Sequence, residues 1–166
     1  MQLQNMDAPI ISVITVCYNV ASTIEKTMLS VLNQTYKNLE YIIIDGNSTD
    51  GTVDIIKKYA ERLTFWISEP DKGIYDAMNK GIVKATGKFL IFMNAGDQFL
   101  NEKVLSKCLP YFLQEIDVIS GIGYLSGQKW IPAKATDLSV AFFLKRSLNH
   151  QATFINRKLF QDNLYR

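Results

Sequence analysis

The sequence predicts an α/β fold: a three-layer α/β/α domain with a mainly parallel central sheet. Short apolar runs rich in β-branched residues alternate with stretches of helical spacing, which is typical of repeated βαβ units. Several of the apolar runs end in loops dense in Asn, Asp, Gly and Ser. The chain has 166 residues, of which 48% are hydrophobic, enough for one domain with a buried core.

The elements follow from this pattern in order. The run 10–16 is apolar and β-branched, and the helix after it carries apolar residues from Ile24 to Leu32. Asp50 or Thr49 is expected to cap the second helix, which carries apolar residues over 53–59. Further strands are expected at 41–44, 63–67, 89–93, 117–122 and 152–156, further helices at 74–85 and 102–112, and a loop or hairpin at 121–135.

The third predicted helix, over 74–85, has its apolar residues at helical spacing. We expect its buried stripe to consist of Ile74, Met78, Ile82 and Val83.

Composition excludes several classes of protein. The apolar content is high and the net charge is only +2, which excludes a disordered chain. Eighteen basic residues face 16 acidic ones without a dense basic block, so no nucleic-acid partner is expected.

Cys17 and Cys108 are expected to be buried free thiols of a reducing compartment, and with a single histidine, His150, no Cys/His metal site is expected.

The N-terminal residues and the length of the apolar runs indicate where in the cell the protein is expected. Residues 1–8 are polar and are expected to form a flexible tail without a signal peptide, followed by one domain over 9–166. No run approaches the ~20 apolar residues of a membrane span. A cytoplasmic protein is expected, and peripheral association with the inner face of the membrane and a homodimer both stay open.

Chemistry is expected where the strands end, because open α/β sheets bind ligands at the carboxyl ends of their strands. Three polar loops follow strands, at 17–19, 45–48 and 94–97, and they should share one edge of the sheet. No P-loop motif is present, and the first βα turn has no G-x-G-x-x-G, which disfavours a dinucleotide fold. Any diphosphate would have to be bound by a metal ion or by basic side chains.

A series of motifs follows the chain in order. They are 11–19, 30–40 (SVLNQTYKNLE), 44–52 (IDGNSTDGT), 69–81 (EPDKGIYDAMNKG), 85–88 (ATGK), 94–97 (NAGD) and 149–151 (NHQ). These motifs resemble those of the family-2 glycosyltransferases of the GT-A fold, in their bacterial polysaccharide and lipopolysaccharide branch. The resemblance is dense from residue 9 to about 97 and thin beyond.

The resemblance makes Asp97 the expected ligand of a divalent cation, Mg²⁺ or Mn²⁺, that neutralises the diphosphate of a nucleotide sugar. Asn94 belongs to the same motif and is expected to contact the donor. Asn94 and Gly96 stand where the family often has acidic residues, so one carboxylate is left. The alternative is that Asp97 only caps a turn made by Gly96.

Further donor contacts are implied for the other strand ends. Asp45 would accept from the base or ribose, although many relatives have a second acidic residue where this chain has Gly46. Tyr18 would stack on the base, with Asn19 and Val16 beside it. The structural alternatives are an Asx-turn at Asp45, a tyrosine at the edge of the core and a turn asparagine.

Two basic groups are candidates for the phosphates. Lys72 lies in Asp71-Lys72-Gly73, just before the third helix, and could reach a phosphate, while Asp71 could simply cap that helix. His150 could contact the metal or the diphosphate, with Lys145 and Arg146 adding charge. Phe142 and Phe143 are expected in the core.

The implied reaction is inverting transfer of a sugar, with UDP-sugars favoured as donors, to a hydroxyl of a growing cell-surface polysaccharide or lipid-linked glycan. Such a displacement needs a general base. The family's acidic motif would be expected to begin near Arg166, and Asp137 and Asp162 lie in no convincing motif. The catalytic base is therefore unassigned, and the acceptor side is expected to be missing or truncated.

Two other readings stay open. The chain could be a non-catalytic module that binds sugar nucleotides or a partner without transfer. A flavodoxin-like receiver is disfavoured, because Cys17-Tyr18-Asn19 supplies no acidic pair after the first strand.

Overall fold

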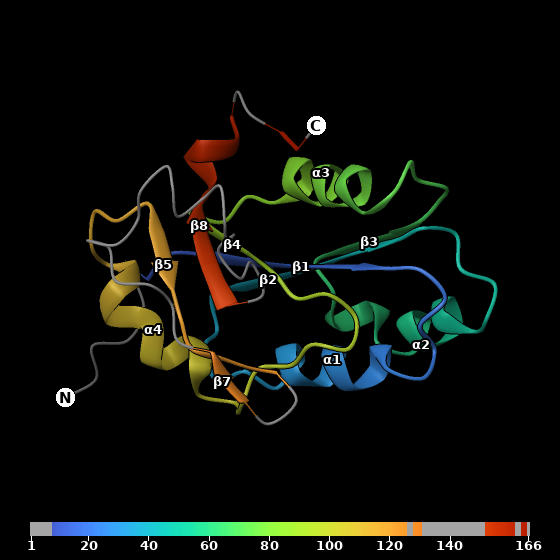
Figure 1. Ribbon diagram of the computed structural model, residues 1–166, viewed down its shortest axis with the longest axis horizontal. Coiled ribbons are helices and arrows are strands. Elements are labelled where there is room, and N and C mark those ends of the chain that lie inside the picture. The colour runs from blue at the N-terminus through green and yellow to red at the C-terminus, as the bar shows by residue number, and fades with distance from the viewer. Residues whose placement is uncertain (1–7, 126–127, 131–151, 162–163, 166) are drawn as a thin grey trace.

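The computed structural model describes residues 8–125, 128–130, 152–161 and 164–165, and it confirms an α/β fold with a mainly parallel sheet (Figure 1). In the described residues the main sheet has six strands, in the order β3-β2-β1-β4-β8-β5. β3, β2, β1 and β4 are parallel, and β8 runs antiparallel to both β4 and β5. The strands are β1 (Ile11–Cys17), β2 (Leu39–Asp45), β3 (Phe65–Ser68), β4 (Phe89–Phe92), β5 (Val118–Ser120) and β8 (Thr153–Asn156).

The central strands are buried on both faces, as parallel strands covered by helices must be. In β1, Ile11 and Val13 point into one core cluster, while Ile14 and Val16 point into the other. Period-2 alternation divides β2 and β4 in the same way. The continuous apolar runs in the sequence therefore reflect two cores that share one sheet.

Helices cover both faces of the sheet. In Figure 1, α1 and α2 lie below the sheet and α3 lies above it. Residues of α1, α2 and α4 pack in the first core cluster, and residues of α3 pack in the second. The helices are α1 (Ile24–Leu32), α2 (Thr52–Lys58), α3 (Ile74–Lys84) and α4 (Val104–Phe112), with short 3₁₀ turns at η1 (Ala60–Arg62) and η4 (Arg157–Phe160).

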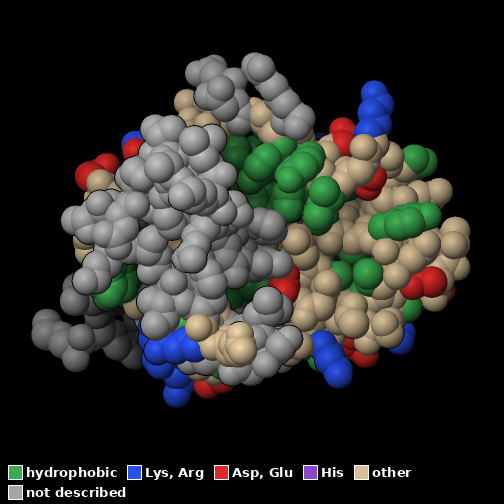
Figure 2. Space-filling model, viewed as in Figure 1, with side chains coloured by type: hydrophobic (Ala, Val, Ile, Leu, Met, Phe, Trp, Pro, Cys, Tyr) green, Lys and Arg blue, Asp and Glu red, His purple; other side chains and the backbone are tan. Residues whose placement is uncertain are grey.

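The predicted buried stripe of α3 is half right. Met78 and Ile82 are buried, but Ile74 and Val83 are 50% and 69% exposed. The buried face is completed instead by Ala77 and by Gly81, where an added Cβ would lie 2.5 Å from Cγ2 of Ile14 in β1. These small residues let α3 lie close on the sheet, which turns the two larger residues outward, and Figure 2 shows hydrophobic side chains gathered on the surface over α3.

The second half of the chain follows the predicted order with shorter elements. Strands predicted at 117–122 and 152–156 are β5 and β8, and α4 begins two residues later than expected. The expected loop or hairpin is a hairpin in its described part, formed by β6 (Gly123–Leu125) and β7 (Gln128–Trp130). The predicted core positions of Phe142 and Phe143 lie outside the described residues.

Both cysteines are free thiols as predicted, with Cys17 buried and Cys108 half-buried. No helix within the described ranges has the length and apolar character needed to cross a membrane.

A carboxylate ties the strands together at the edge of the sheet opposite their carboxyl ends. Glu40 Oε2 accepts from Ser12 Oγ at 2.6 Å, from Thr86 N at 2.9 Å and from Gly87 N at 3.2 Å, and Thr86 Oγ1 donates to Glu40 Oε1. Burial acts to raise the pKa of Glu40, but these hydrogen bonds together outweigh it and hold the pKa below its usual value.

A lowered pKa in the folded state means that the Glu40 carboxylate stabilises the fold above its unfolded pKa and stops doing so as the pH falls through its folded pKa. We therefore expect Glu40→Gln to lower the free energy of unfolding at pH 7 and to cost less at pH 3. Urea unfolding of both proteins at the two pH values measures this. An equal cost at both would show that the ionised carboxylate contributes nothing.

Candidate functional site

The parallel register brings three polar loops to one edge of the sheet, which we call the rim. Cys17 at the end of β1 pairs with Asp45 at the end of β2. Beyond the end of β4, Met93 N donates to Ile14 O at 2.9 Å, so the next residues leave the sheet at the same edge. Segments 18–19, 46–48 and 94–97 therefore lie on the rim, as predicted.

Asp45 is a buried carboxylate at the centre of the rim, and its residue is 0% exposed. Oδ1 accepts from Ser48 Oγ at 2.5 Å and from Cys17 Sγ at 3.5 Å. Oδ2 accepts from Ser48 N at 2.9 Å and from Ser68 Oγ at 2.6 Å. The bond to Ser48 N reaches three residues along the chain, one more than in the Asx-turn that was the structural alternative for Asp45. Ser68, which sequence reasoning missed, links the carboxylate to the end of β3.

Asn19 joins the first two loops. Its main-chain N–H donates to Ser48 Oγ at 2.7 Å, and its side-chain Oδ1 accepts from Thr49 N at 2.9 Å. Asn19 adopts a positive φ of 52°, a conformation that asparagine tolerates better than most residues. The side chain thus shapes the rim.

Asp50 makes a second link between the same loops. Oδ2 accepts from Ala21 N at 2.9 Å, and Oδ1 accepts from Thr52 N at 3.0 Å and from Thr52 Oγ1 at 2.6 Å. Asp50, and not Thr49, is therefore the residue that satisfies an N–H of the first turn of α2.

Gly46 lies beside Tyr18 and Asp71, and a side chain at position 46 would require the Asp71 carboxylate to shift. An added Cβ would lie 2.6 Å from Asp71 Oδ2 and 3.4 Å from Tyr18 Cδ2. The Asp71 carboxylate thus occupies the space that a side chain at position 46 would need. Tyr18 is 62% exposed, so its ring is accessible on the rim.

The segment before α3 is a tight turn. Asp71 Oδ1 accepts from Gly73 N at 2.8 Å, and Asp76 Oδ2 accepts from Lys72 N at 3.1 Å. Lys72 is exposed in this turn. Val16, also a predicted contact, is 6% exposed, and its side chain packs in the core cluster that includes residues of α3.

Asp97 ends a turn that begins at Asn94. Asp97 N donates to Asn94 O at 2.9 Å, and Gly96 has a φ of +103°, which the third position of a type II turn requires. Asn94 and Asp97 are both half-buried. The described part of the chain contains no cluster of three His, Cys, Asp or Glu side chains that could hold a metal ion alone.

This donor set fits a cation that is bound mainly by substrate. Mg²⁺ and similar hard ions keep several waters and take one or two carboxylates together with phosphate oxygens. Asp97 can supply one such carboxylate.

The rim carries negative charge around Cys17. Burial raises the pKa of the Cys17 thiol, and the carboxylates of Asp45, Asp50 and Asp71 raise it further. These acidic groups would repel a diphosphate, so an anionic ligand on this edge needs a cation or basic side chains beside it.

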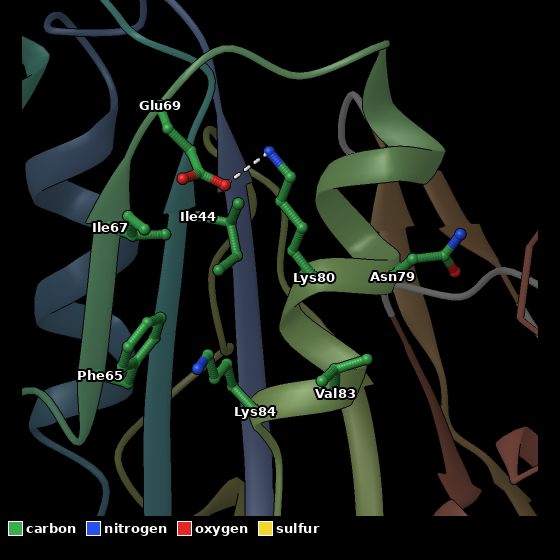
Figure 3. A pocket seen from close by; sticks show the side chains of 8 residues that line it. All are labelled: Ile44, Phe65, Ile67, Glu69, Asn79, Lys80, Val83 and Lys84. Atoms are coloured by element: carbon green, nitrogen blue, oxygen red, sulfur yellow. Dashed lines mark ion pairs between the residues drawn. The ribbon is translucent and has the colours of Figure 1, made fainter.

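A groove of about 310 Å³ lies between β3 and α3, with Phe65, Ile67, Ile44 and Val83 as its apolar lining (Figure 3). The Lys80–Glu69 ion pair, at 2.8 Å, lies at one end of it. The described side chains that line it come from β2, β3, α3 and Glu69, so it is distinct from the loops of the rim.

His150, Lys145 and Arg146, predicted near the diphosphate, lie outside the described residues.

The contact between Gly46 and Asp71 was missed, because nothing in the sequence shows that residues 25 positions apart meet. The available signal was the glycine itself, at a position where related motifs carry an acid.

A family model for glycosyl transferase family 2 matches residues 12–163. The chain belongs to this family. It is 34% identical over 161 residues to a PGL/p-HBAD biosynthesis glycosyltransferase of Mycobacterium bovis, a match that covers 93% of this chain and 62% of the relative. It is 37% identical over 119 residues to TuaG of Bacillus subtilis, assigned provisionally to teichuronic acid biosynthesis, with 70% of this chain and 47% of TuaG covered.

Solved structures of glycosyltransferases share the fold. The mannosyltransferase PcManGT of Pyrobaculum calidifontis, in complex with GDP-Man and Mn²⁺, is 26% identical at a TM-score of 0.62, covering 68% of this chain and 35% of that one. TarS of S. aureus, in complex with UDP-GlcNAc, is 21% identical at a TM-score of 0.73, covering 93% and 47%. The chain thus spans about three fifths or less of these family relatives and neighbours.

The close approach of Asp71 to Gly46 can be tested by a double-mutant cycle. Gly46 does not have a positive φ, so Gly46→Ala introduces a steric conflict without backbone strain. We expect it to lower the free energy of unfolding by about 1 kcal/mol, since the Asp71 carboxylate must shift while its other oxygen is bonded to Gly73 N. In an Asp71→Ala background Gly46→Ala should cost much less, and urea unfolding of the four proteins measures both costs. Equal costs in the two backgrounds would refute the contact.

Proposed function

We propose that this chain, over residues 9–166, binds the nucleotide-diphospho-sugar donor of a family-2 glycosyltransferase on its rim. The observation that carries the proposal is that Tyr18, Asp71 and the Asp97 turn all follow strands at the carboxyl edge of one parallel sheet, where α/β proteins bind ligands. The family match and the donor complexes of two neighbours support it.

The nucleoside is assigned to the side of the rim formed by β1 and β2. The exposed ring of Tyr18 offers a face on which a base can stack. Both oxygens of Asp45 already accept hydrogen bonds from Ser48, Ser68 and Cys17, so Asp45 acts by holding the loop. The acceptor for a base N–H is then Asp71, whose Oδ2 lies above Gly46. Asp71 can take this role because position 46 is a glycine, which leaves space for the Asp71 carboxylate.

The diphosphate is assigned to the side of the rim that carries Asp97 and Asn94. A divalent cation, Mg²⁺ or Mn²⁺, would be held by Asp97 and the phosphate oxygens. When bound, it stabilises the charge of the leaving nucleoside diphosphate. Lys72 could add a positive charge from the turn before α3, and His150 stays a predicted contact.

The reaction proposed is inverting transfer. An acceptor hydroxyl oxygen attacks the anomeric carbon, the bond from that carbon to the diphosphate breaks, and a base takes the hydroxyl proton. We assign no residue to the base. A UDP-sugar is the favoured donor, and a hydroxyl of a growing cell-surface polysaccharide or lipid-linked glycan is the favoured acceptor. Two relatives named for PGL/p-HBAD and teichuronic acid biosynthesis support an acceptor of this kind.

The alternative is a module that binds the donor without transferring the sugar. The rim residues in the described ranges bind and position but include no assigned base, which keeps this alternative in view. Assaying the chain for sugar transfer and for donor hydrolysis separates the two, since a pure binding module shows neither activity.

A cytoplasmic location, at the inner face of the membrane, would suit a lipid-linked acceptor, and a homodimer stays a prediction.

Calorimetric titration with UDP and with GDP, with and without Mn²⁺, tests the cation site. We expect Asp97→Ala to weaken binding in Mn²⁺ by about ten-fold or more, because a charge-assisted contact is lost, and to leave binding in EDTA unchanged. Asp54→Ala removes an exposed carboxylate paired with Lys57 on α2 and serves as the control. If Asp97→Ala binds as tightly as the parent in Mn²⁺, Asp97 does not hold the cation.

Stacking on Tyr18 makes a second prediction. Tyr18→Ala should weaken nucleotide binding by about ten-fold, since stacking contributes about 1–3 kcal/mol per base, whereas Tyr18→Phe keeps the ring and should bind normally. Tyr111→Ala, which removes an exposed tyrosine from α4, is the matched control. The same titration measures all three variants, and normal binding by Tyr18→Ala would exclude the stacking contact.

A further inference from the structure

A line of polar side chains on α1 and the turn after it has no role in the function proposed above. Thr27, Ser30 and Gln34 follow one another at spacings of three and four residues, which places them on one face of the helix. We call them the polar stripe. Thr27 is 0% exposed and Gln34 is 3% exposed. Ser30 and Gln34 belong to the family-like motif 30–40, for which the sequence suggests no function.

The first two residues of the polar stripe bind the loop that carries Asp97. Thr27 Oγ1 accepts from Gly96 N at 2.9 Å. Ser30 Oγ accepts from Phe99 N at 3.3 Å and donates to Thr27 O at 2.8 Å. The two main-chain N–H groups on either side of Asp97 and Gln98 are thus bound by hydroxyls of one helix.

Gln34 holds the far end of the same segment. Its Nε2 donates to Asn101 O at 2.7 Å, and its Oε1 accepts from Leu105 N at 3.1 Å, in the first turn of α4. Nε2 also donates to Ser30 O at 3.1 Å, which fixes the amide against α1. The polar stripe therefore binds the segment from Gly96 to Leu105 at four main-chain groups.

The hydrogen bonds of the polar stripe add little net free energy of folding. A polar side chain costs free energy when it is buried, and a hydrogen bond does little more than offset that cost. An apolar residue at position 27 would pack against the same core without needing a partner. What the polar stripe adds is a fixed position for the main chain of one loop, and Gly96 adjoins Asp97 directly.

We propose that the polar stripe is a positioning device for the cation site, in which Thr27 fixes the Gly96–Asp97 peptide and thereby the place where the Asp97 carboxylate meets the cation and the diphosphate. This inference rests on the proposed function of Asp97. Thr27 acts through Gly96 and is a positioning residue, not a catalytic one.

The test uses Thr27→Val, which keeps the shape of the side chain and removes the acceptor for Gly96 N. Its matched control is Ser12→Ala. Ser12 Oγ is also a buried hydroxyl that accepts from a glycine, Gly87 N at 2.9 Å, but it lies at the opposite edge of the sheet. Thr27→Ser restores the hydroxyl and should restore binding.

The readout is the ratio of nucleotide affinity with Mn²⁺ to that in EDTA, measured by calorimetry on the whole chain. We expect Thr27→Val to lower this ratio by about ten-fold, as for a lost hydrogen bond in a fixed geometry, while Ser12→Ala and Thr27→Ser leave it unchanged. The melting temperature of Ser12→Ala should fall at least as far as that of Thr27→Val, because Ser12 Oγ also donates to Glu40 Oε2 at 2.6 Å. A lower ratio in Thr27→Val alone is then not an effect of lost stability. A ratio that is unchanged in Thr27→Val, or lowered equally in Ser12→Ala, overturns the proposal.

Amide hydrogen exchange gives a readout that needs no nucleotide. In the parent, the Gly96 N–H should be protected, and in Thr27→Val it should exchange about ten-fold faster or more. If the parent shows no cation-dependent binding, the proposed function fails, and the exchange at Gly96 still decides whether Thr27 holds the loop. Equal exchange in parent and Thr27→Val overturns the positioning role in either case.

Discussion

The rim depends on one buried carboxylate. Asp45 accepts hydrogen bonds from Ser48, Ser68 and Cys17, and so connects the ends of three neighbouring strands and the loop after β2. A buried carboxylate is costly unless several donors satisfy it, and here the donors come from different segments of the chain. The negative charge therefore specifies how these segments meet. The exposed ring of Tyr18 and the half-buried Asp71 lie beside these connected segments.

Much of this architecture could be predicted from the sequence. The apolar β-branched runs gave β1, β2 and β4 within two residues, and parallel pairing of such strands placed the three polar loops on one edge. Helical spacing identified α1 to α4, but it misplaced Ile74 and Val83, because a hydrophobicity pattern does not weigh the close packing that Ala77 and Gly81 permit. The candidate residues Tyr18, Asn19, Asp45 and Asp97 do lie at strand ends, where the motifs put them.

The partners of those residues could not be predicted, because they come from distant parts of the chain. Nothing local in the sequence shows that Ser68 reaches Asp45, that Asp71 covers Gly46 or that Thr27 reaches Gly96. Each contact requires the packing of a loop from one βα unit against another. Local sequence thus indicated which side chains are chemically capable, and only tertiary structure distinguishes those that hold the rim from those left to meet a ligand.

The order of strands also bears on the chain entropy of the rim. The side assigned to the nucleoside joins residues 28 positions apart, as in Cys17 and Asp45, whereas the side with Asp97 closes over 78 positions, as in Thr15 and Met93. Loop closure depends only on the logarithm of length, so the longer connection costs about 0.9 kcal/mol more. A site whose second half comes from far along the chain therefore costs little additional closure entropy. The helices between the strands can then support the rim.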